Sequence, residues 1–175
     1  MNPSTCLSIL LTISLFFNSH SIPLKSSSKL YQNICQDAGN NNERCLKLLE
    51  ANPRITSAKD YLTLNKLFLS MAIEKATKGQ DYLKTLIKEH PFSQAIKQCS
   101  NDDYNGLVTS FRSSLSELVD DPISANYDAK VAGDGPEACD QALAKEKIVN
   151  HYVSTMNNDM KFLSYVAYLA TNYLR

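Results

Sequence analysis

Apolar residues recur at helical spacing along most of the chain, and this pattern limits the fold more than any other feature. The cleanest example is one apolar stripe made of Tyr104, Leu107, Val108, Phe111, Leu115, Leu118 and Val119. Spacings of three and four residues place such side chains on one face of an α-helix. No segment alternates apolar and polar residues over the length of a strand. The sequence therefore predicts an all-α protein.

The same pattern predicts two short helices followed by four further helices. The short helices flank a polar turn at residues 37–42, and the second ends at Asn52-Pro53, because proline disfavours helical backbone in the preceding residue. The other helices are expected over residues 60–89, 91–119, 122–132 and 145–175. Short connections make consecutive helices antiparallel. The expected fold is an up-down-up-down four-helix bundle with an N-terminal helical hairpin.

Two glycine positions interrupt these helical patterns. Gly79 lies inside the segment 60–89, where a kink is expected because glycine is a weak helix former. The cluster Gly133-Asp134-Gly135-Pro136 is expected to break or loosen the third bundle helix before Cys139. This cluster lies within Asp121–Asp140, the stretch that departs most from a regular bundle.

The first residues have the composition of a secretory signal peptide. A short polar start precedes the apolar run Cys6–Phe17, and Ser19 and Ser21 supply the small residues of a cleavage site. The alternative is an N-terminal membrane anchor, but the run falls short of the roughly 20 residues that span a bilayer. We expect a signal peptide over residues 1–21 and one secreted domain over residues 22–175.

Four cysteines remain in this domain, because Cys6 would leave with the signal peptide. An even number of cysteines in a secreted chain favours two disulfides over free thiols. Three pairings are possible; the short separation of Cys35 and Cys45 suits a local bridge across the hairpin, which leaves Cys99 for Cys139. A zinc site is the alternative, but the sequence has no C-x-x-C motif and no nearby pair of histidines.

Charge is distributed unevenly, although the chain has 18 basic and 18 acidic residues. Residues 22–99 contain 12 basic and 7 acidic side chains, residues 100–140 contain 2 and 9, and residues 141–175 contain 4 and 2. A neutral chain gives no support for a nucleic-acid partner. The acidic excess of residues 100–140 makes this region the candidate interaction surface, although a solvated acidic face would explain any single charge.

Sequence signals for catalysis are sparse. His90 and His151 stand near no motif that would make either a base or a metal ligand, and the chain has no G-x-S-x-G, H-E-x-x-H or phosphate-binding glycine loop. Adjacent carboxylates such as Asp120 and Asp121 point to different sides of a helix or cap its end. We therefore expect a binding protein, with no catalytic residue, cofactor or metal.

Several short sequence motifs, together with the cysteine spacing, resemble those of a known family. The motifs are Ile34-Cys35, Arg44–Leu46, Ser124–Tyr127 and Glu137–Asp140. In this respect the chain resembles the plant invertase and pectin methylesterase inhibitor family. The resemblance implies a secreted four-helix bundle with a protruding hairpin, and disulfides Cys35–Cys45 and Cys99–Cys139. It also implies inhibition of a cell-wall or vacuolar carbohydrate-active enzyme by covering its active-site cleft.

The resemblance also bears on the target enzyme. Invertase inhibitors of this family carry a Pro-Lys-Phe motif that reaches an acidic catalytic pocket. The matching positions here are Pro122, Ile123 and Ser124, so the proline is present but the lysine and the phenylalanine are missing. A pectin methylesterase instead binds a polyanion, so its cleft should accept an acidic partner. Pectin methylesterase is the favoured partner and acid invertase (beta-fructofuranosidase) the alternative. The candidate partner-binding residues are Asp120, Asp121, Pro122, Ile123, Ser124 and Asp128.

Two other functions stay open on the sequence. A helical carrier of apolar ligands would need a large dry cavity, whereas the apolar stripes here suffice only to fill a bundle. A non-inhibitory structural or allergen-like protein is the other alternative. No membrane partner is expected after cleavage of the signal peptide.

Overall fold

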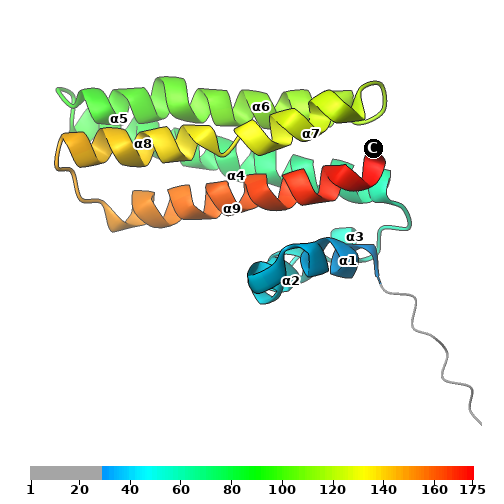
Figure 1. Ribbon diagram of the computed structural model, residues 1–175. Helices are drawn as coiled ribbons and strands as arrows, with labels where there is room; N and C mark the ends of the chain where they lie inside the picture. Colours follow the sequence, from blue (N-terminus) through cyan, green and yellow to red (C-terminus); the bar gives the residue numbers. More distant parts are fainter. Residues whose placement is uncertain (1–28) are drawn as a thin grey trace, which may run out of the picture.

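The structure is a computed structural model that describes residues 29–175, and every regular element in this range is a helix (Figure 1). The signal peptide predicted over residues 1–21 lies outside the described residues. Between residues 29 and 175, no helix is both long and apolar enough to cross a membrane.

Four antiparallel helical segments form the bundle; each is a single helix or a run of consecutive helices and is called here a rod. The first is α4 (Tyr61–Glu89), and the second joins α5 (Gln94–Gln98), the π-helical turn η2 (Cys99–Asp103) and α6 (Tyr104–Glu117). The third joins α7 (Pro122–Val131) and α8 (Asp134–Lys145), and the fourth is α9 (His151–Thr171) followed by η3 (Asn172–Leu174). Helix α4 packs against α6 and α9, and α7 packs against the same two helices. This arrangement confirms the up-down-up-down bundle.

Polar side chains fix where several of the helices begin. At each start, a side-chain oxygen accepts a hydrogen bond from a backbone N–H of the first turn, which otherwise has no partner inside the helix. The capping residues are Asn52 for α3 (Pro53–Thr56), Asp60 for α4, Ser93 for α5, Asp121 for α7 and Asn150 for α9.

The N-terminal hairpin consists of α1 (Leu30–Asp37), η1 (Gly39–Asn41), α2 (Asn42–Glu50) and α3 (Pro53–Thr56). The predicted disulfide joins Cys35 to Cys45, with the two Cα atoms 5.3 Å apart. The hairpin packs against the bundle, because α1 contacts both α4 and α9. Arg44 of α2 reaches α9, where it donates to Asp159 Oδ1 at 2.9 Å and lies 4.0 Å from the ring centre of Phe162. This docked position differs from the protruding hairpin that the family resemblance implies.

The expected start of the last helix is wrong by six residues. Residues 146–150 form a turn rather than the beginning of a helix, and α9 starts at His151. Glu146 accepts hydrogen bonds from Ser93 Oγ at 2.6 Å and from the Ala95 N–H at 2.9 Å. These bonds tie the turn to the start of α5 on the second rod.

The break predicted near Gly133–Pro136 is confirmed, whereas Gly79 has a role in packing that the expected kink does not describe. Helix α4 passes through Gly79 as one continuous helix, and a Cβ at Gly79 would lie only 2.7 Å from Tyr104 Cε1. Gly79 therefore makes room for a buried ring. At Gly133–Pro136 the third rod does break, between Val131 and Asp134, but helix resumes before Cys139. Pro136 lies in the first turn of α8, where its missing N–H has no helical partner to lose.

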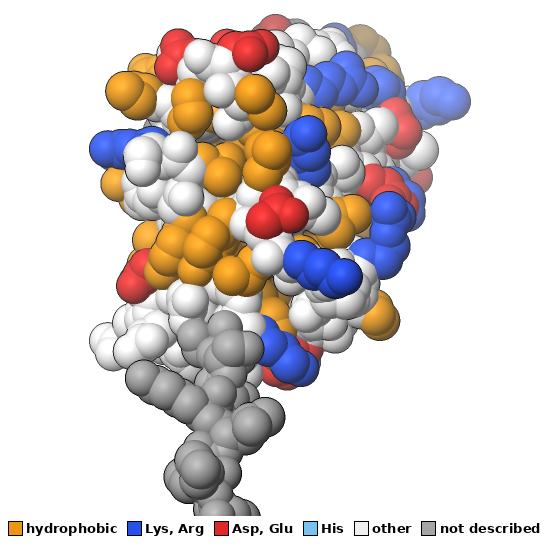
Figure 2. Space-filling view, turned by 90° about the vertical axis from the view of Figure 1, so that its right-hand side faces the viewer, with side chains coloured by type: hydrophobic (Ala, Val, Ile, Leu, Met, Phe, Trp, Pro, Cys, Tyr) orange, Lys and Arg blue, Asp and Glu red, His pale blue; other side chains and the backbone are white. Residues whose placement is uncertain are grey.

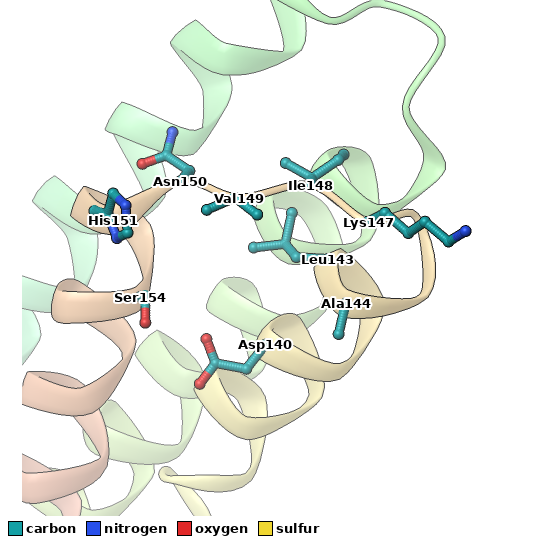
Figure 3. A pocket seen from close by; sticks show the side chains of 9 residues that line it. All are labelled: Asp140, Leu143, Ala144, Lys147, Ile148, Val149, Asn150, His151 and Ser154. Carbon is teal, nitrogen blue, oxygen red and sulfur yellow. The ribbon is translucent and has the colours of Figure 1, made fainter.

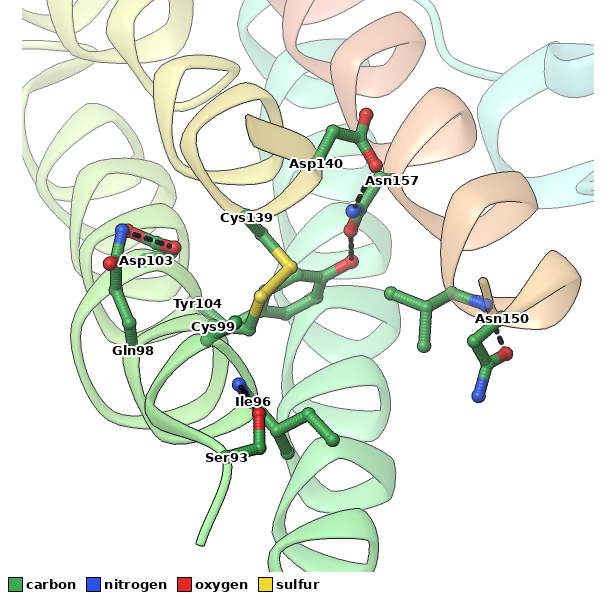
Figure 4. The surroundings of a disulfide bond; sticks show 12 residues. Ser93, Ile96, Gln98, Cys99, Asp103, Tyr104, Cys139, Asp140, Asn150 and Asn157 are labelled. Atoms are coloured by element: carbon green, nitrogen blue, oxygen red, sulfur yellow. Dashed lines mark hydrogen bonds between the residues drawn. A yellow bond between two sulfur atoms is a disulfide. The ribbon is translucent and has the colours of Figure 1, made fainter. Parts of the chain in front are cut away.

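The second disulfide joins Cys99 of η2 to Cys139 of α8, and so links the second rod to the third as predicted. Next to it, the buried Tyr104 hydroxyl donates to Asn157 Oδ1 at 2.7 Å, and Asn157 Nδ2 donates to Asp140 Oδ1 at 2.6 Å (Figure 4). Lys161 then donates to Asp140 Oδ2 at 2.9 Å. This polar network connects α6, α8 and α9 beside the disulfide.

Candidate functional site

The candidate partner-binding residues lie where α6 ends and α7 begins, a region called here the α6–α7 corner (residues 117–128). The connecting turn projects at one end of the bundle (Figure 1). Asp120 lies in this turn, Asp121 caps α7, and Pro122, Ile123 and Ser124 form the first turn of α7. Asp128 lies one further turn along the same helix. The corner therefore gathers all the candidates.

Two of these residues have a local structural role. The Asp121 carboxylate accepts a hydrogen bond from the Ser124 N–H at 3.1 Å and another from Ser124 Oγ at 2.6 Å. The pKa of Asp121 is lowered by these two hydrogen bonds. Asp121 and Ser124 thus start α7. Asp120 and Ile123 are exposed to a partner, whereas Asp128 is half-buried and lies beside Glu117.

An exposed apolar surface accompanies the acids. Ile123 is 70% exposed, Tyr127 is 64% exposed and Val119 is 60% exposed. Ile123 and Tyr127 are four residues apart on α7, so they lie on one face of the helix. The apolar spacing predicts a core position for Val119, but Val119 lies beyond the last residue of α6 and faces solvent. Tyr127 is not among the predicted contact residues, although its i, i+4 spacing from Ile123 is a signal for it.

Buried contacts hold the corner in place. Ser114 Oγ donates to the Ala125 carbonyl at 2.8 Å, which joins α6 to α7. Asn126 Nδ2 donates to the Tyr168 carbonyl at 2.8 Å and to Thr171 Oγ1 at 2.9 Å, which joins α7 to α9. Because α7 is fixed on both sides, the exposed residues of the corner form a preorganised surface.

Glu117 is a further acid of the corner and is not among the predicted contact residues. Its Oε2 atom is shielded from solvent. Its pKa is raised, first by this loss of solvent and then by the negative charge of the neighbouring Asp128. The proximity of Glu117 and Asp128 depends on the packing of α6 on α7, so no local sequence pattern could reveal it.

A hollow of about 530 Å³ lies at the opposite end of the bundle, at the turn between α8 and α9 (Figure 3). It is lined by Asp140, Leu143, Ala144, Lys147, Ile148, Val149, Asn150, His151 and Ser154. The hollow is open to solvent, since Val149 on its rim is 81% exposed. It therefore differs from the dry internal cavity that a carrier of apolar ligands would need.

The presence of Asp, His and Ser side chains in this hollow raises the question of nucleophilic catalysis. Asp140 is already engaged by Asn157 and Lys161. Within residues 29–175, no hydrogen bond joins the His151 side chain to Asp140 or Ser154, and Figure 3 places His151 and Asp140 on different helices across the opening. A catalytic triad requires a chain of hydrogen bonds from acid to base to nucleophile. These residues do not form one.

Comparisons with known proteins agree with this geometry. The family model described as plant invertase/pectin methylesterase inhibitor matches residues 29–175. A mutant form of a pectin methylesterase inhibitor from Arabidopsis has a similar structure, with a TM-score of 0.71, 22% identity and coverage of 85% of this chain and 99% of that chain. A pectin methylesterase inhibitor from Arabidopsis thaliana aligns with a TM-score of 0.61 at 24% identity, covering 85% of this chain and 98% of that chain.

A search of curated proteins finds no match. At these identities the two solved structures show a shared fold, whereas the family model covers the full described part of the chain. The members of this family are inhibitors and not enzymes. The chain belongs to the plant invertase/pectin methylesterase inhibitor family and is a plant enzyme inhibitor.

Proposed function

We propose that this protein inhibits a pectin methylesterase by placing the α6–α7 corner over the substrate cleft of the enzyme. The observation that carries the proposal is the composition of the corner. Exposed Ile123 and Tyr127 lie beside Asp120 and Asp128, and no cation stands where invertase inhibitors of the family carry a lysine. The two solved structures compared above are both pectin methylesterase inhibitors.

Electrostatic complementarity favours this target over acid invertase. A cleft that binds a polyanionic substrate attracts carboxylates such as Asp120 and Asp128. The carboxylate-lined pocket of an invertase would repel the same residues, and the apolar Ile123 side chain cannot offset that repulsion.

The contact must extend beyond the corner itself. Protease–inhibitor complexes bury about 800 Å² on each partner, which is more than one turn and the first residues of a helix can supply. We therefore include the outer surfaces of α6 and α7 that adjoin the corner. Apolar side chains at the centre and acids at the rim would match the usual anatomy of such an interface.

The proposal includes secretion to the cell wall or apoplast, with a vacuolar destination as the alternative. A signal peptide over residues 1–21 would direct the domain over residues 22–175 to the secretory pathway. The two disulfides suit an oxidising compartment.

A paired inhibition assay tests the target. The oxidised domain is incubated with a plant pectin methylesterase and, separately, with an acid invertase, and residual activity is measured over a range of inhibitor concentrations. We expect stoichiometric loss of the methylesterase activity and none of the invertase activity. Inhibition of the invertase alone would reverse the assignment of the target.

A further inference from the structure

The hairpin and α4 carry a basic surface that the proposed enzyme contact does not use. Residues 44–78 contain seven basic and three acidic side chains. Within the described residues, five of these cations are exposed and form no ion pair; this set is called here the basic hairpin face. Its members are Lys47, Arg54, Lys59, Lys66 and Lys75.

The three acids of this segment have partners of their own. Asp60 caps α4, accepting from the Thr63 N–H at 2.7 Å and from its hydroxyl at 2.9 Å. Glu74 pairs with Lys78 at 2.6 Å, and Glu50 accepts from the Tyr31 hydroxyl at 3.2 Å. These acids are therefore satisfied locally, and the five cations face solvent as unpaired positive charges.

Two hollows bring most of these cations together between the hairpin and the bundle. One, of about 180 Å³, has Arg44, Lys47 and Lys75 at its edge; Leu48, Phe162 and Leu163 supply its apolar walls. Its one acid, Asp159, is paired with Arg44. The other, of about 400 Å³, has Arg54 and Lys59 at its edge beside Leu67 and Ala58; its one acid, Asp60, caps α4. Each hollow thus combines positive charge with a small apolar surface.

The basic hairpin face and the α6–α7 corner lie on different sides of the molecule. The hairpin packs against α4 and α9, and α6 lies across the bundle from it (Figure 1). Figure 2 views the end of the molecule nearest the corner; acidic side chains lie at the top and elsewhere on this face, and Lys and Arg side chains are more numerous toward the right-hand side. One surface can therefore be occupied while the other remains accessible.

We propose that the basic hairpin face binds a linear polyuronate, the carboxylated polymer that a pectin methylesterase produces. The identity of the polymer rests on the proposed function. Hydrolysis of each methyl ester by water releases methanol and leaves one carboxylate on the chain, so the polymer becomes more anionic where the enzyme has acted. Binding to this product holds the inhibitor close to its active target.

The charge of the surface attracts anionic polymers, and the proposed function selects the carboxylated glycan among them. Four of the five unpaired cations are lysines, which act as point charges toward carboxylates and phosphates alike. The apolar walls of both hollows can in addition contact the carbon-bound hydrogens of sugar rings.

The test measures binding of the inhibitor alone, without enzyme, to polygalacturonate and to fully methyl-esterified pectin of similar length. One variant carries Lys47→Gln, Arg54→Gln, Lys59→Gln and Lys75→Gln. The matched control carries Lys88→Gln, Lys97→Gln, Lys145→Gln and Lys147→Gln, which change the net charge equally on other surfaces. Calorimetry or sedimentation at low and at high salt gives the affinities.

We expect the unmodified protein to bind polygalacturonate in low salt, to bind the esterified polymer at least about tenfold more weakly, and to lose binding in high salt. The four-residue hairpin variant should bind about tenfold or more weakly, since an exposed ion pair contributes a factor of up to about five. The control should change by less than about twofold.

Three results would overturn the proposal: equal affinity for both polymers, an equal loss in the control, or binding to anionic phospholipid vesicles without binding to polygalacturonate. Separately, the hairpin variant should bind a pectin methylesterase as the unmodified protein does, measured by calorimetry in the absence of polymer. Failure of that enzyme contact in the unmodified protein would contradict the proposed function, while the polymer measurement would still stand by itself.

Discussion

Gly135 of α8 lies against the backbone carbonyl of Asp103 in η2, so closely that a Cβ on residue 135 would overlap that oxygen atom. Cys139 follows one helical turn later and forms its disulfide with Cys99 of the same η2 turn. Residues four apart share a helix face. The absence of a side chain at Gly135 therefore lets α8 approach η2 closely enough for the disulfide, whose Cα atoms are 4.7 Å apart.

Replacing Gly135 by alanine should destabilise the protein by about 1–3 kcal/mol, because the added methyl group must displace backbone rather than a flexible side chain. Gly106→Ala is the matched control, since a Cβ at Gly106 in α6 meets nothing within 4 Å. There the higher helix propensity of alanine should stabilise by about 0.5–1 kcal/mol. Denaturant unfolding of both variants measures the difference; equal stabilities would contradict the close approach.

Local signals predicted much of this architecture. Helix α4 was expected over residues 60–89 and spans Tyr61–Glu89, because Asp60 caps it and Pro91 follows it closely. The pairing of the cysteines was also confirmed. The predicted start of α9 is wrong because Ile148 fits the apolar spacing of the helix, whereas Glu146 accepts hydrogen bonds from Ser93 and Ala95 and holds residues 146–150 as a turn. A contact between segments that are distant in sequence does not change the spacing of apolar residues, so the sequence pattern does not reveal it.

In the α6–α7 corner, too, local sequence predicts some features and tertiary contacts determine the others. The residues from Asp120 to Asp128 are neighbours in sequence, so the sequence alone groups them. The capping role of Asp121 follows from its place before Pro122, but the exposure of Val119 and the approach of Glu117 to Asp128 required the packing of α6 on α7. Local pattern thus locates the surface, and tertiary packing decides which of its side chains a partner can reach.

Tyr104→Phe should destabilise the protein by about 1–3 kcal/mol. The buried hydroxyl donates to Asn157 Oδ1 at 2.7 Å, and its removal leaves a fully buried amide oxygen without that partner. Tyr127→Phe is the control, because this ring is 64% exposed at the corner; its effect should stay within about 0.5 kcal/mol. Urea unfolding of the two variants provides the comparison, and similar losses in both would argue against a stabilising Tyr104–Asn157 bond.

Glu117→Gln should stabilise the protein increasingly as pH rises. The pKa of Glu117 is raised in the folded protein, so the folded state holds this proton more tightly than the unfolded chain does. The resulting stability is fully present below the ordinary glutamate pKa of about 4.3 and is lost as pH rises through the raised value. Glutamine stays neutral throughout. The difference in Tm between variant and parent should therefore grow from about pH 4 to about pH 7, and a constant difference would contradict the raised pKa.

The acids of the corner should act on the target mainly through long-range attraction. Asp120→Asn combined with Asp128→Asn removes two charges without disturbing the Asp121 cap of α7. We expect inhibition of a pectin methylesterase to weaken about three- to tenfold in low salt, chiefly through slower association, because rim charges steer encounter more than they hold a complex. The difference should shrink in high salt, where charges farther apart than the Debye length are screened. Asp102→Asn combined with Asp134→Asn makes the same charge change at exposed positions outside the corner and should leave inhibition nearly unaltered. The test measures the association rates of the two double variants with the enzyme at low and at high salt. If association slows equally in both variants, only the net charge attracts the enzyme. If the association rate changes in neither, the acidic corner does not face the cleft.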